Sequence, residues 1–175
     1  MIRQSIEVPA TPHRAWQVWA EPQFIVEWFS DQAAGGPLPG DQLIWQFNGF
    51  DRPMGARVLR SHPGRELILS LDAGSTSSLL EVCFEPIDGA TNVVVTQSGL
   101  PEGGEFDELA IGIASGWANA LEYLRLYLAQ YQGRAKRSVV AMSPIGASCE
   151  AAMQWFEPGL KRERWLDVPA TDLQF

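Results

Sequence analysis

The chain has 175 residues, 46% hydrophobic and 19% charged, which is typical of one soluble domain with or without an extension and excludes disordered and fibrous chains. A formal charge of -8 at pH 7 repels phosphate backbones, so a nucleic acid is not an expected partner. With only two cysteines, no apolar signal core at the start and no uncharged apolar stretch longer than 109–121, we expect a cytoplasmic protein without a membrane span.

The first elements are predicted to be a strand followed by two short helices. Apolar and polar residues alternate over 2–8, which indicates a strand. Thr11 is a suitable N-cap and Pro12 fits the first helical position, so a helix begins here. Pro22 ends this helix and begins another, which finishes before the turn-rich segment 35–40.

The middle of the chain is predicted to form an antiparallel meander. Its strand-like runs cover 42–48, 54–61, 66–71, 78–86 and 91–98. The short gaps between them contain glycine or Pro-Gly, which is typical of hairpins. In the fourth run the acidic residues share one parity, which directs Leu80, Val82 and Phe84 to the core and Cys83 to the outer face.

A helical period begins at about residue 105 and continues to about residue 131, and Gly133 is a plausible stop. Its apolar residues fall within one arc: Phe106, Ala110, Ile113, Trp117, Leu121, Leu124 and Leu128. The order of elements predicts an α+β fold. In it, a curved antiparallel sheet of about six strands wraps around one long C-terminal helix, and two short helices follow strand 1.

A series of short motifs along 1–130 supports this architecture. The motifs are Ile6–Pro12 with Ala15-Trp16, Glu27-Trp28-Phe29, Phe84-Glu85-Pro86, Thr91–Pro101, and Gly116-Trp117 with Leu121 and Leu124. In their shared order they resemble the START-like (SRPBCC) helix-grip proteins, and within these the branch named for homologues of the activator of the ninety-kilodalton heat-shock chaperone ATPase. The resemblance implies a cavity between sheet and long helix. The superfamily uses this cavity for lipophilic ligands, and some branches serve polyketide cyclisation or chaperone contact.

The end of the chain differs from the rest. Residues 1–130 carry 16 acidic and 7 basic side chains, whereas 131–175 carry 5 and 6. We therefore expect a helix-grip domain over 1–132 and a C-terminal extension over 133–175. The extension contains the large apolar side chains of Trp155, Phe156 and Trp165, which are expected to be covered rather than left in water. We therefore expect the extension to dock on its own domain or on a homodimer partner, with a short helix over Ser148–Glu157.

Residues with chemical reactivity are few and scattered. His13 and His62 are 49 positions apart and neither belongs to a ligand-spaced pair, so no metal and no cofactor is expected. Ser115 is one position late for a nucleophile elbow and falls inside the predicted long helix. No catalytic residue is therefore assigned.

Two glycines inside the long helix, Gly112 and Gly116, should each cost about 1 kcal/mol relative to alanine. They are explained either by close packing on the sheet or by room for a ligand beside Trp117. The candidate ligand-binding residues are those that can line such a cavity: Trp28, Trp45, Phe47, Phe84, Gln97, Trp117 and Leu121. Aromatic residues here can equally be core, and an inward Gln97 is either a polar anchor or is satisfied by buried water.

The function favoured by these observations is noncatalytic binding of a small hydrophobic or lipid-like ligand in the cavity. The alternative is a protein-interaction module of the chaperone-activator kind, with a chaperone or a second copy as partner. A third hypothesis is an enzyme like the polyketide cyclases, for which the sequence names no base or nucleophile.

Overall fold

The computed structural model of the chain describes residues 1–73, 76–101, 103–104, 106–134, 136–138, 146–148 and 150–151, without the side chains of 72, 73 and 76. The chain divides into two compact units, Met1–Val140 and Ala141–Phe175, and the architecture below is that of the first. Of the predicted helix Ser148–Glu157, residues 150 and 151 are helical and the Ala151 N–H donates to Ser148 Oγ at 3.2 Å. The rest of that helix, and most of the predicted extension, lies outside the described residues.

The elements follow the predicted order, with one strand more. They are β1 (Ile2–Val8), α1 (Pro12–Ala20), α2 (Pro22–Trp28), β2 (Gln32–Gly35), β3 (Gln42–Gln46), β4 (Met54–His62), β5 (Glu66–Ala73), β6 (Thr76–Ile87), β7 (Ala90–Ser98), α3 (Phe106–Leu126) and a π-helical turn (Tyr127–Tyr131).

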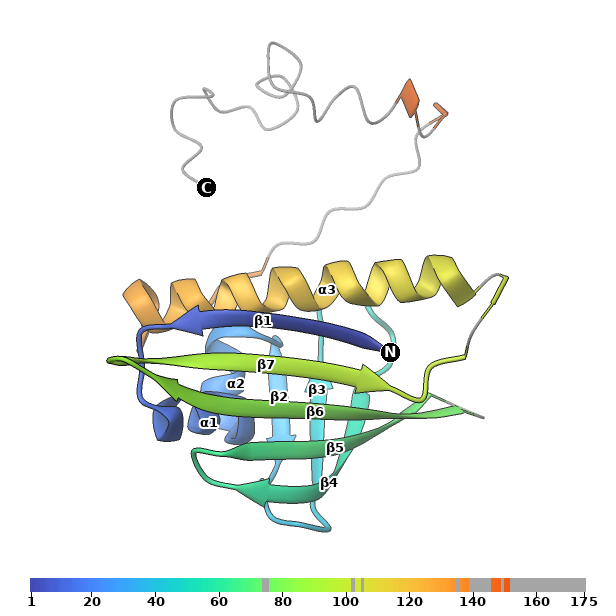
Figure 1. The fold of residues 1–175 in the computed structure, drawn as a ribbon. Coiled ribbons are helices and arrows are strands. Elements are labelled where there is room, and N and C mark those ends of the chain that lie inside the picture. The colour runs from blue at the N-terminus through green and yellow to red at the C-terminus, as the bar shows by residue number, and fades with distance from the viewer. Residues whose placement is uncertain are drawn as a thin grey trace, which may run out of the picture. The chain divides into compact units, whose positions relative to one another are not determined.

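The strands form one antiparallel sheet in the order β1-β7-β6-β5-β4-β3-β2. From β2 to β7 each strand pairs with its neighbour in sequence, whereas β1 pairs with β7, placing Ile6 opposite Val93. In Figure 1, β2 and β3 run steeply across the direction of β1 and β7, so the sheet is strongly twisted, and α3 lies over it. This confirms the predicted α+β helix-grip fold.

The alternation of side chains along the central strands is as predicted. Leu80, Val82 and Phe84 of β6 are buried, while Cys83, between Val82 and Phe84, is only partly buried. Leu69 and Leu67 of β5 lie opposite Leu80 and Val82 and are buried too. Since opposite residues in a register share a face, one face of the sheet is apolar and carries the core.

The first two helices begin where the sequence predicts. The Thr11 Oγ1 accepts the backbone N–H of Arg14 at 3.3 Å, and Pro12 occupies the first position of α1. The indole of Trp28, the last residue of α2, donates to the carbonyl of Val18 in α1 at 2.8 Å. Because this bond is buried, it locks the two helices to each other.

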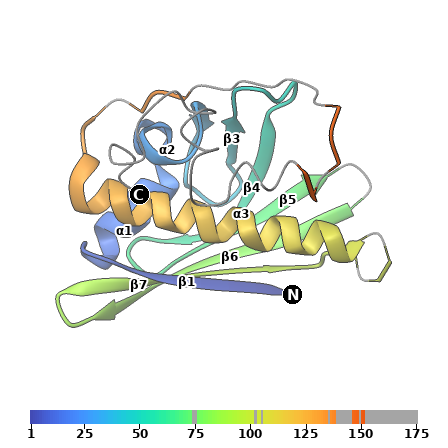
Figure 2. The same cartoon turned by 90° about the horizontal axis from the view of Figure 1, so that it is seen from above.

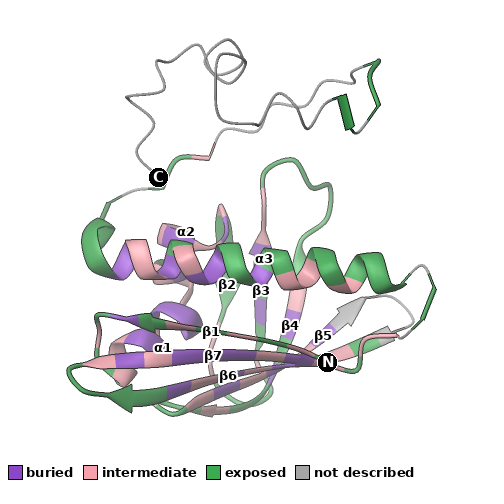
Figure 3. Cartoon of the chain, turned by 45° about the horizontal axis from the view of Figure 1, so that its top comes forward, coloured by how far each residue is buried: buried purple, intermediate pink, exposed green. Residues whose placement is uncertain are grey.

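The long helix has two unlike halves (Figure 3). None of the described residues 106–116 is fully buried, whereas Trp117, Leu121 and Leu124 are. Figure 2, a view from above, shows α3 crossing over the sheet, and this helix packs against β1. Its C-terminal half is therefore held on the sheet, while its N-terminal half stands away from it. Gly133, at φ +74°, follows the π-helical turn and ends the helix.

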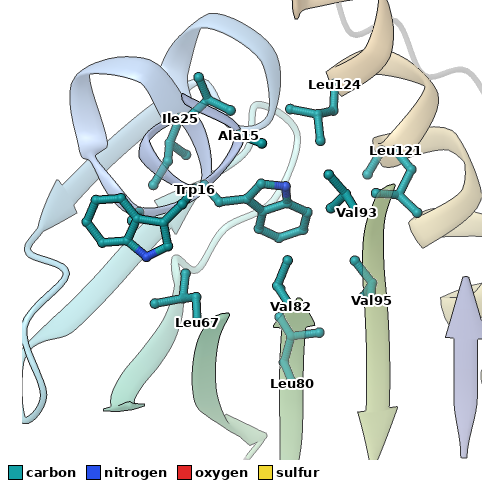
Figure 4. Packing of buried hydrophobic residues seen from close by; sticks show 14 of the residues in the cluster. Ala15, Trp16, Ile25, Leu67, Leu80, Val82, Val93, Val95, Leu121 and Leu124 are labelled. Carbon is teal, nitrogen blue, oxygen red and sulfur yellow. The ribbon is translucent and has the colours of Figure 1, made fainter. Parts of the chain in front are cut away.

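The core joins the C-terminal half of α3 to the sheet. Figure 4 shows Leu121 and Leu124 of α3 beside Val93 and Val95 of β7, and all four side chains are buried. Each such burial contributes about 1.5–3 kcal/mol. These contacts set the distance between helix and sheet at this end.

The additional strand, β2, is an edge strand paired only with β3. Its sequence, Gln-Ala-Ala-Gly, has none of the β-branched or aromatic residues that indicate strands. It forms because β3 offers an open edge beside it, which is a tertiary cause that the local sequence does not carry.

Candidate functional site

A cavity of about 430 Å³ lies under the N-terminal half of α3. We call it the helix–sheet cavity. Among its lining residues are the apolar side chains of Phe29, Leu71, Leu100, Phe106, Leu109 and Ile113. The polar ones are Ser78 of β6 and Gln97 of β7, and no charged side chain is found among its described lining residues. Such walls suit an uncharged apolar molecule with a small polar group.

The polar groups of this cavity form a chain of hydrogen bonds. The buried indole N–H of Trp117 donates to Gln97 Oε1 at 2.7 Å, and Gln97 Nε2 donates to Ser78 Oγ at 3.0 Å. An indole N–H can only donate, so it fixes which end of the amide faces the helix. Gln97 is thereby held in one orientation, with one N–H and one lone pair left beyond these two bonds.

The two helical glycines have room around them. A Cβ added at Gly112 or at Gly116 would meet no heavy atom within 4 Å, so close packing on the sheet does not explain them. Gly116 lines the helix–sheet cavity next to Trp117, whereas Gly112 is not among its lining residues. Of the two explanations drawn from the sequence, only the one that leaves room beside Trp117 fits, and it fits Gly116 alone.

A second cavity, of about 580 Å³, lies where the end of α2 and the end of β3 meet the C-terminal end of α3. Its aromatic lining includes Trp28, Phe47, Phe50, Tyr123, Tyr127 and Tyr131, and its charged lining consists of Glu27, Asp31, Arg134 and Lys136. Sequence reasoning did not predict this cavity, because its walls come from four separate segments.

Two of the charged residues of the second cavity, Lys136 and Asp31, form an ion pair. Lys136 Nζ lies 3.6 Å from Asp31 Oδ1 and donates to the carbonyl of Phe29 at 2.8 Å. Hydrogen bonds from Ser138 and from the backbone N–H of Asn48, with the charge of Lys136, lower the pKa of Asp31. These contacts tie the segment after α3 to the end of α2.

Glu27 makes a second tie between α2 and the end of α3. It accepts a short hydrogen bond from the Tyr127 hydroxyl and a longer one, at 3.3 Å, from the Gly133 N–H. Burial, together with the hydrogen bond to Glu27, raises the pKa of Tyr127 to about 12. Tyr127 is therefore a neutral donor at physiological pH, which suits it to hold structure rather than to transfer protons.

The predicted ligand-binding residues are divided among three places. Gln97 and Trp117 line the helix–sheet cavity, and Trp28 and Phe47 line the second cavity. The other three, Trp45, Phe84 and Leu121, are buried in the core and are not among the lining residues of these two cavities.

One residue that the sequence did not single out for binding, Phe29, joins these groups. Its ring contacts those of Trp19, Trp28, Trp45, Phe47 and Trp117, with centroids 5.2–6.2 Å apart. The sequence marked it only as part of the Glu27-Trp28-Phe29 motif, and it directly follows the last residue of a short helix. Phe29 is singled out only by the tertiary structure, which brings five other aromatic rings into contact with it.

The described residues offer neither a metal-binding cluster nor a helix suited to a membrane. In that part of the chain, no three side chains of His, Cys, Asp or Glu cluster in a way that could hold a metal ion. Within the same residues, no helix is long and apolar enough to cross a membrane.

Comparison with known proteins gives one family. The model of the family described as "Activator of Hsp90 ATPase homolog 1-like protein" matches residues 9–129. None of the curated proteins matches the sequence.

Three of the solved structures that share this fold are the following. The Aha1 dimer from Colwellia psychrerythraea has 20% identity and a TM-score of 0.66, covering 75% of this chain and 98% of that chain. DynU16, from the dynemicin biosynthetic locus, has 19% identity and a TM-score of 0.67, covering 78% and 49%. CalU16 from Micromonospora echinospora has 19% identity and a TM-score of 0.59, covering 73% and 75%. At such identities the likeness concerns the fold.

Proposed function

The chain belongs to the family of activator of Hsp90 ATPase homolog 1-like proteins, and we propose that it binds a small neutral lipophile in the helix–sheet cavity without chemical conversion. The observation that carries the proposal is the composition of the cavity wall, which is apolar apart from Ser78 and Gln97. A buried wall of this kind favours apolar surface by about 25 cal/mol per Å² removed from water.

The entrance of the cavity also suits an apolar ligand. Phe106 and Leu109 on α3 and Met54 on β4 line the cavity and are 41%, 50% and 47% exposed. Large apolar side chains that remain exposed around a cavity are typical of a binding site. A ligand that covered them would remove this surface from water.

The polar part of the ligand is expected to be a hydroxyl or a carbonyl group. Beyond its bonds to Trp117 and Ser78, Gln97 has one more N–H and one more lone pair without a partner among the described residues, and Ser78 has a hydroxyl that can donate. A carboxylate would lose its hydration without gaining an opposite charge from the described lining residues, which is costly. We therefore expect neutral ligands to bind more tightly than their anionic analogues.

The proposal also accounts for the lack of an assigned catalyst. Acid–base catalysis needs a titratable side chain within hydrogen-bonding reach of the substrate. The described walls of the helix–sheet cavity contain no Asp, Glu, His, Lys, Cys or Tyr. This favours binding over the cyclase-like hypothesis.

The test is a titration calorimetry panel of fatty alcohols, fatty acids, sterols and aromatic ketones, run on the wild type and on Gly116→Leu. The added leucine would fill open space in the cavity beside Trp117. We expect at least one neutral lipophile to bind the wild type, and Gly116→Leu to weaken it by about tenfold, which is the effect of displacing two methylene groups.

The matched control is Gly112→Leu, which places the same side chain one turn earlier on the same helix, in open space but outside the cavity lining. It should leave affinity unchanged. The proposal is wrong if nothing in the panel binds the wild type, or if the two leucine variants weaken binding equally.

A second candidate function is self-association through the outer side of α3. Ile111 on this helix is 67% exposed and is not among the lining residues of either cavity. The similar Colwellia psychrerythraea protein is described as a dimer. If α3 forms a dimer contact here, light scattering should show a dimer that Ile111→Asp dissociates and that Asn119→Asp, at another exposed position of α3, does not. A monomeric wild type at high concentration would rule this function out.

A further inference from the structure

The ring of Phe29 lies between side chains of the two cavities. Phe29 lines the helix–sheet cavity and stacks on Trp117 of the same wall, with ring centroids 6.1 Å apart and planes 9° from parallel. The centroid of the Phe29 ring also lies 5.2 Å from the ring centroids of Trp28 and Phe47, both of which line the second cavity. One half-buried side chain therefore contacts the walls of both cavities.

The backbone of Phe29 is held, so a change at this position acts through its side chain. Its N–H donates to the carbonyl of Ile25 at 2.9 Å, and its carbonyl accepts Lys136 Nζ at 2.8 Å. Lys136 also pairs with Asp31, two residues further along the chain. Substitution of the ring leaves all these contacts in place.

We propose that Phe29 sets the maximum length of the ligand, by separating the helix–sheet cavity from the second cavity. This inference rests on the proposed function, because it concerns ligands of the helix–sheet cavity. With the ring present, an apolar chain has about 430 Å³ available. Without it, the chain would continue into a further 580 Å³, which more than doubles the space.

The apolar character of the passage supports this reading. Trp28, Phe47 and Phe50 provide aromatic surface in the second cavity beyond Phe29. Each methylene group that leaves water for such a surface raises affinity by about fourfold. A chain that crosses the position of Phe29 by two methylene groups should therefore gain on the order of tenfold in affinity.

The experiment measures the affinities of octanol, decanol, dodecanol and tetradecanol by titration calorimetry, for the wild type and for Phe29→Ala. For the wild type, affinity should rise with chain length and then stop rising. For Phe29→Ala, it should continue to rise, so that tetradecanol binds about tenfold more tightly than to the wild type, while octanol binds with similar affinity.

The control is Phe50→Ala, which enlarges the second cavity at a side chain that is 70% exposed and lies outside the helix–sheet cavity. It should keep the wild-type length limit. Far-UV circular dichroism establishes that each variant is folded. Phe29→Leu is the second variant, because leucine keeps apolar contact with the surrounding rings; it should shift the limit in the same direction, and it decides the question if Phe29→Ala does not fold.

The outcomes separate the two proposals. If the wild type binds the alcohols but the folded Phe29 variants show the same length limit, or if the wild type shows no limit, Phe29 does not set the length and the proposed function stands. If no alcohol binds the wild type while other lipophiles of the panel do, the length limit fails for this ligand class. If nothing binds at all, the proposed function fails, and the length limit fails with it.

Discussion

The hydrogen bond between Trp117 and Gln97 offers the most direct test of how the helix–sheet cavity is built. The perturbation is Trp117→Phe, which keeps an aromatic ring on α3 but removes the N–H that Gln97 Oε1 accepts at 2.7 Å. The same substitution in a Gln97→Leu background removes only the packing of the larger ring. The difference between the two effects is the energy of the hydrogen bond.

The magnitude follows from burial. Gln97 is 5% exposed and Trp117 is 8% exposed, so an amide oxygen without its donor would cost about 1–3 kcal/mol. Gln97 also lines the cavity, where water can replace the lost donor, so we expect the lower end of that range. The smaller ring loses about 1 kcal/mol of apolar burial as well. Trp117→Phe should therefore cost about 2 kcal/mol in the wild type and about 1 kcal/mol in the Gln97→Leu background.

The assay is urea unfolding followed by far-UV circular dichroism, because indole fluorescence is itself changed by the substitution. All four proteins of the cycle must show the same dependence on urea, so that the midpoints report stability. A coupling energy below about 0.5 kcal/mol would refute the reasoning. It would mean that the Trp117–Gln97 bond contributes nothing to the cavity wall.

Three further predictions concern the frame around the cavities. Gly112→Ala should raise the free energy of unfolding by about 1 kcal/mol, since its Cβ meets no atom within 4 Å; a lower urea midpoint would contradict the open space seen there. Thr11→Ala should lower the free energy of unfolding by about 1 kcal/mol, because the Thr11 hydroxyl caps α1 at the Arg14 N–H, and an unchanged midpoint would show that the cap is not needed. The pKa of Tyr127 is raised from 10.0 to about 12 by burial and by Glu27, so its contribution is fully present below pH 10 and is lost as pH rises through 12. Between pH 10 and pH 12 the free energy of unfolding should therefore fall less for Tyr127→Phe than for the wild type. An equal fall in both proteins would exclude this linkage.

Much of the fold was predictable because strands and helices differ in the period of their side chains. The alternation in β6 correctly directs Leu80 and Val82 inward. The predicted arc of the long helix contains the buried Trp117, Leu121 and Leu124, but it lacks the buried Ala120 and includes Phe106, which is 41% exposed. The edge strand β2 was not predictable. Its four residues carry no pattern, and it forms only because β3 lies beside it.

The candidate site was predictable only in part. The helical arc through Trp117 follows from local sequence, which left the direction of Gln97 open; the structure buries Gln97, and the hydrogen bond between the two brings both to one cavity. The sequence equally suggested Trp45 and Phe84, which lie in the core. Local pattern distinguishes an inward side chain from an outward one, but it does not distinguish a filled interior from a hollow one.

The sequence by itself therefore determined the order of elements, the apolar face of each and the residues that turn inward. Only the tertiary structure decided how far apart the faces lie. Leu121 and Leu124 hold one end of α3 on the sheet, while the other end stands away from it and leaves the helix–sheet cavity. It also decided that the ring of Phe29 lies between two cavities. Both outcomes depend on contacts between distant segments, and the side-chain period of a single segment carries no information about such distances.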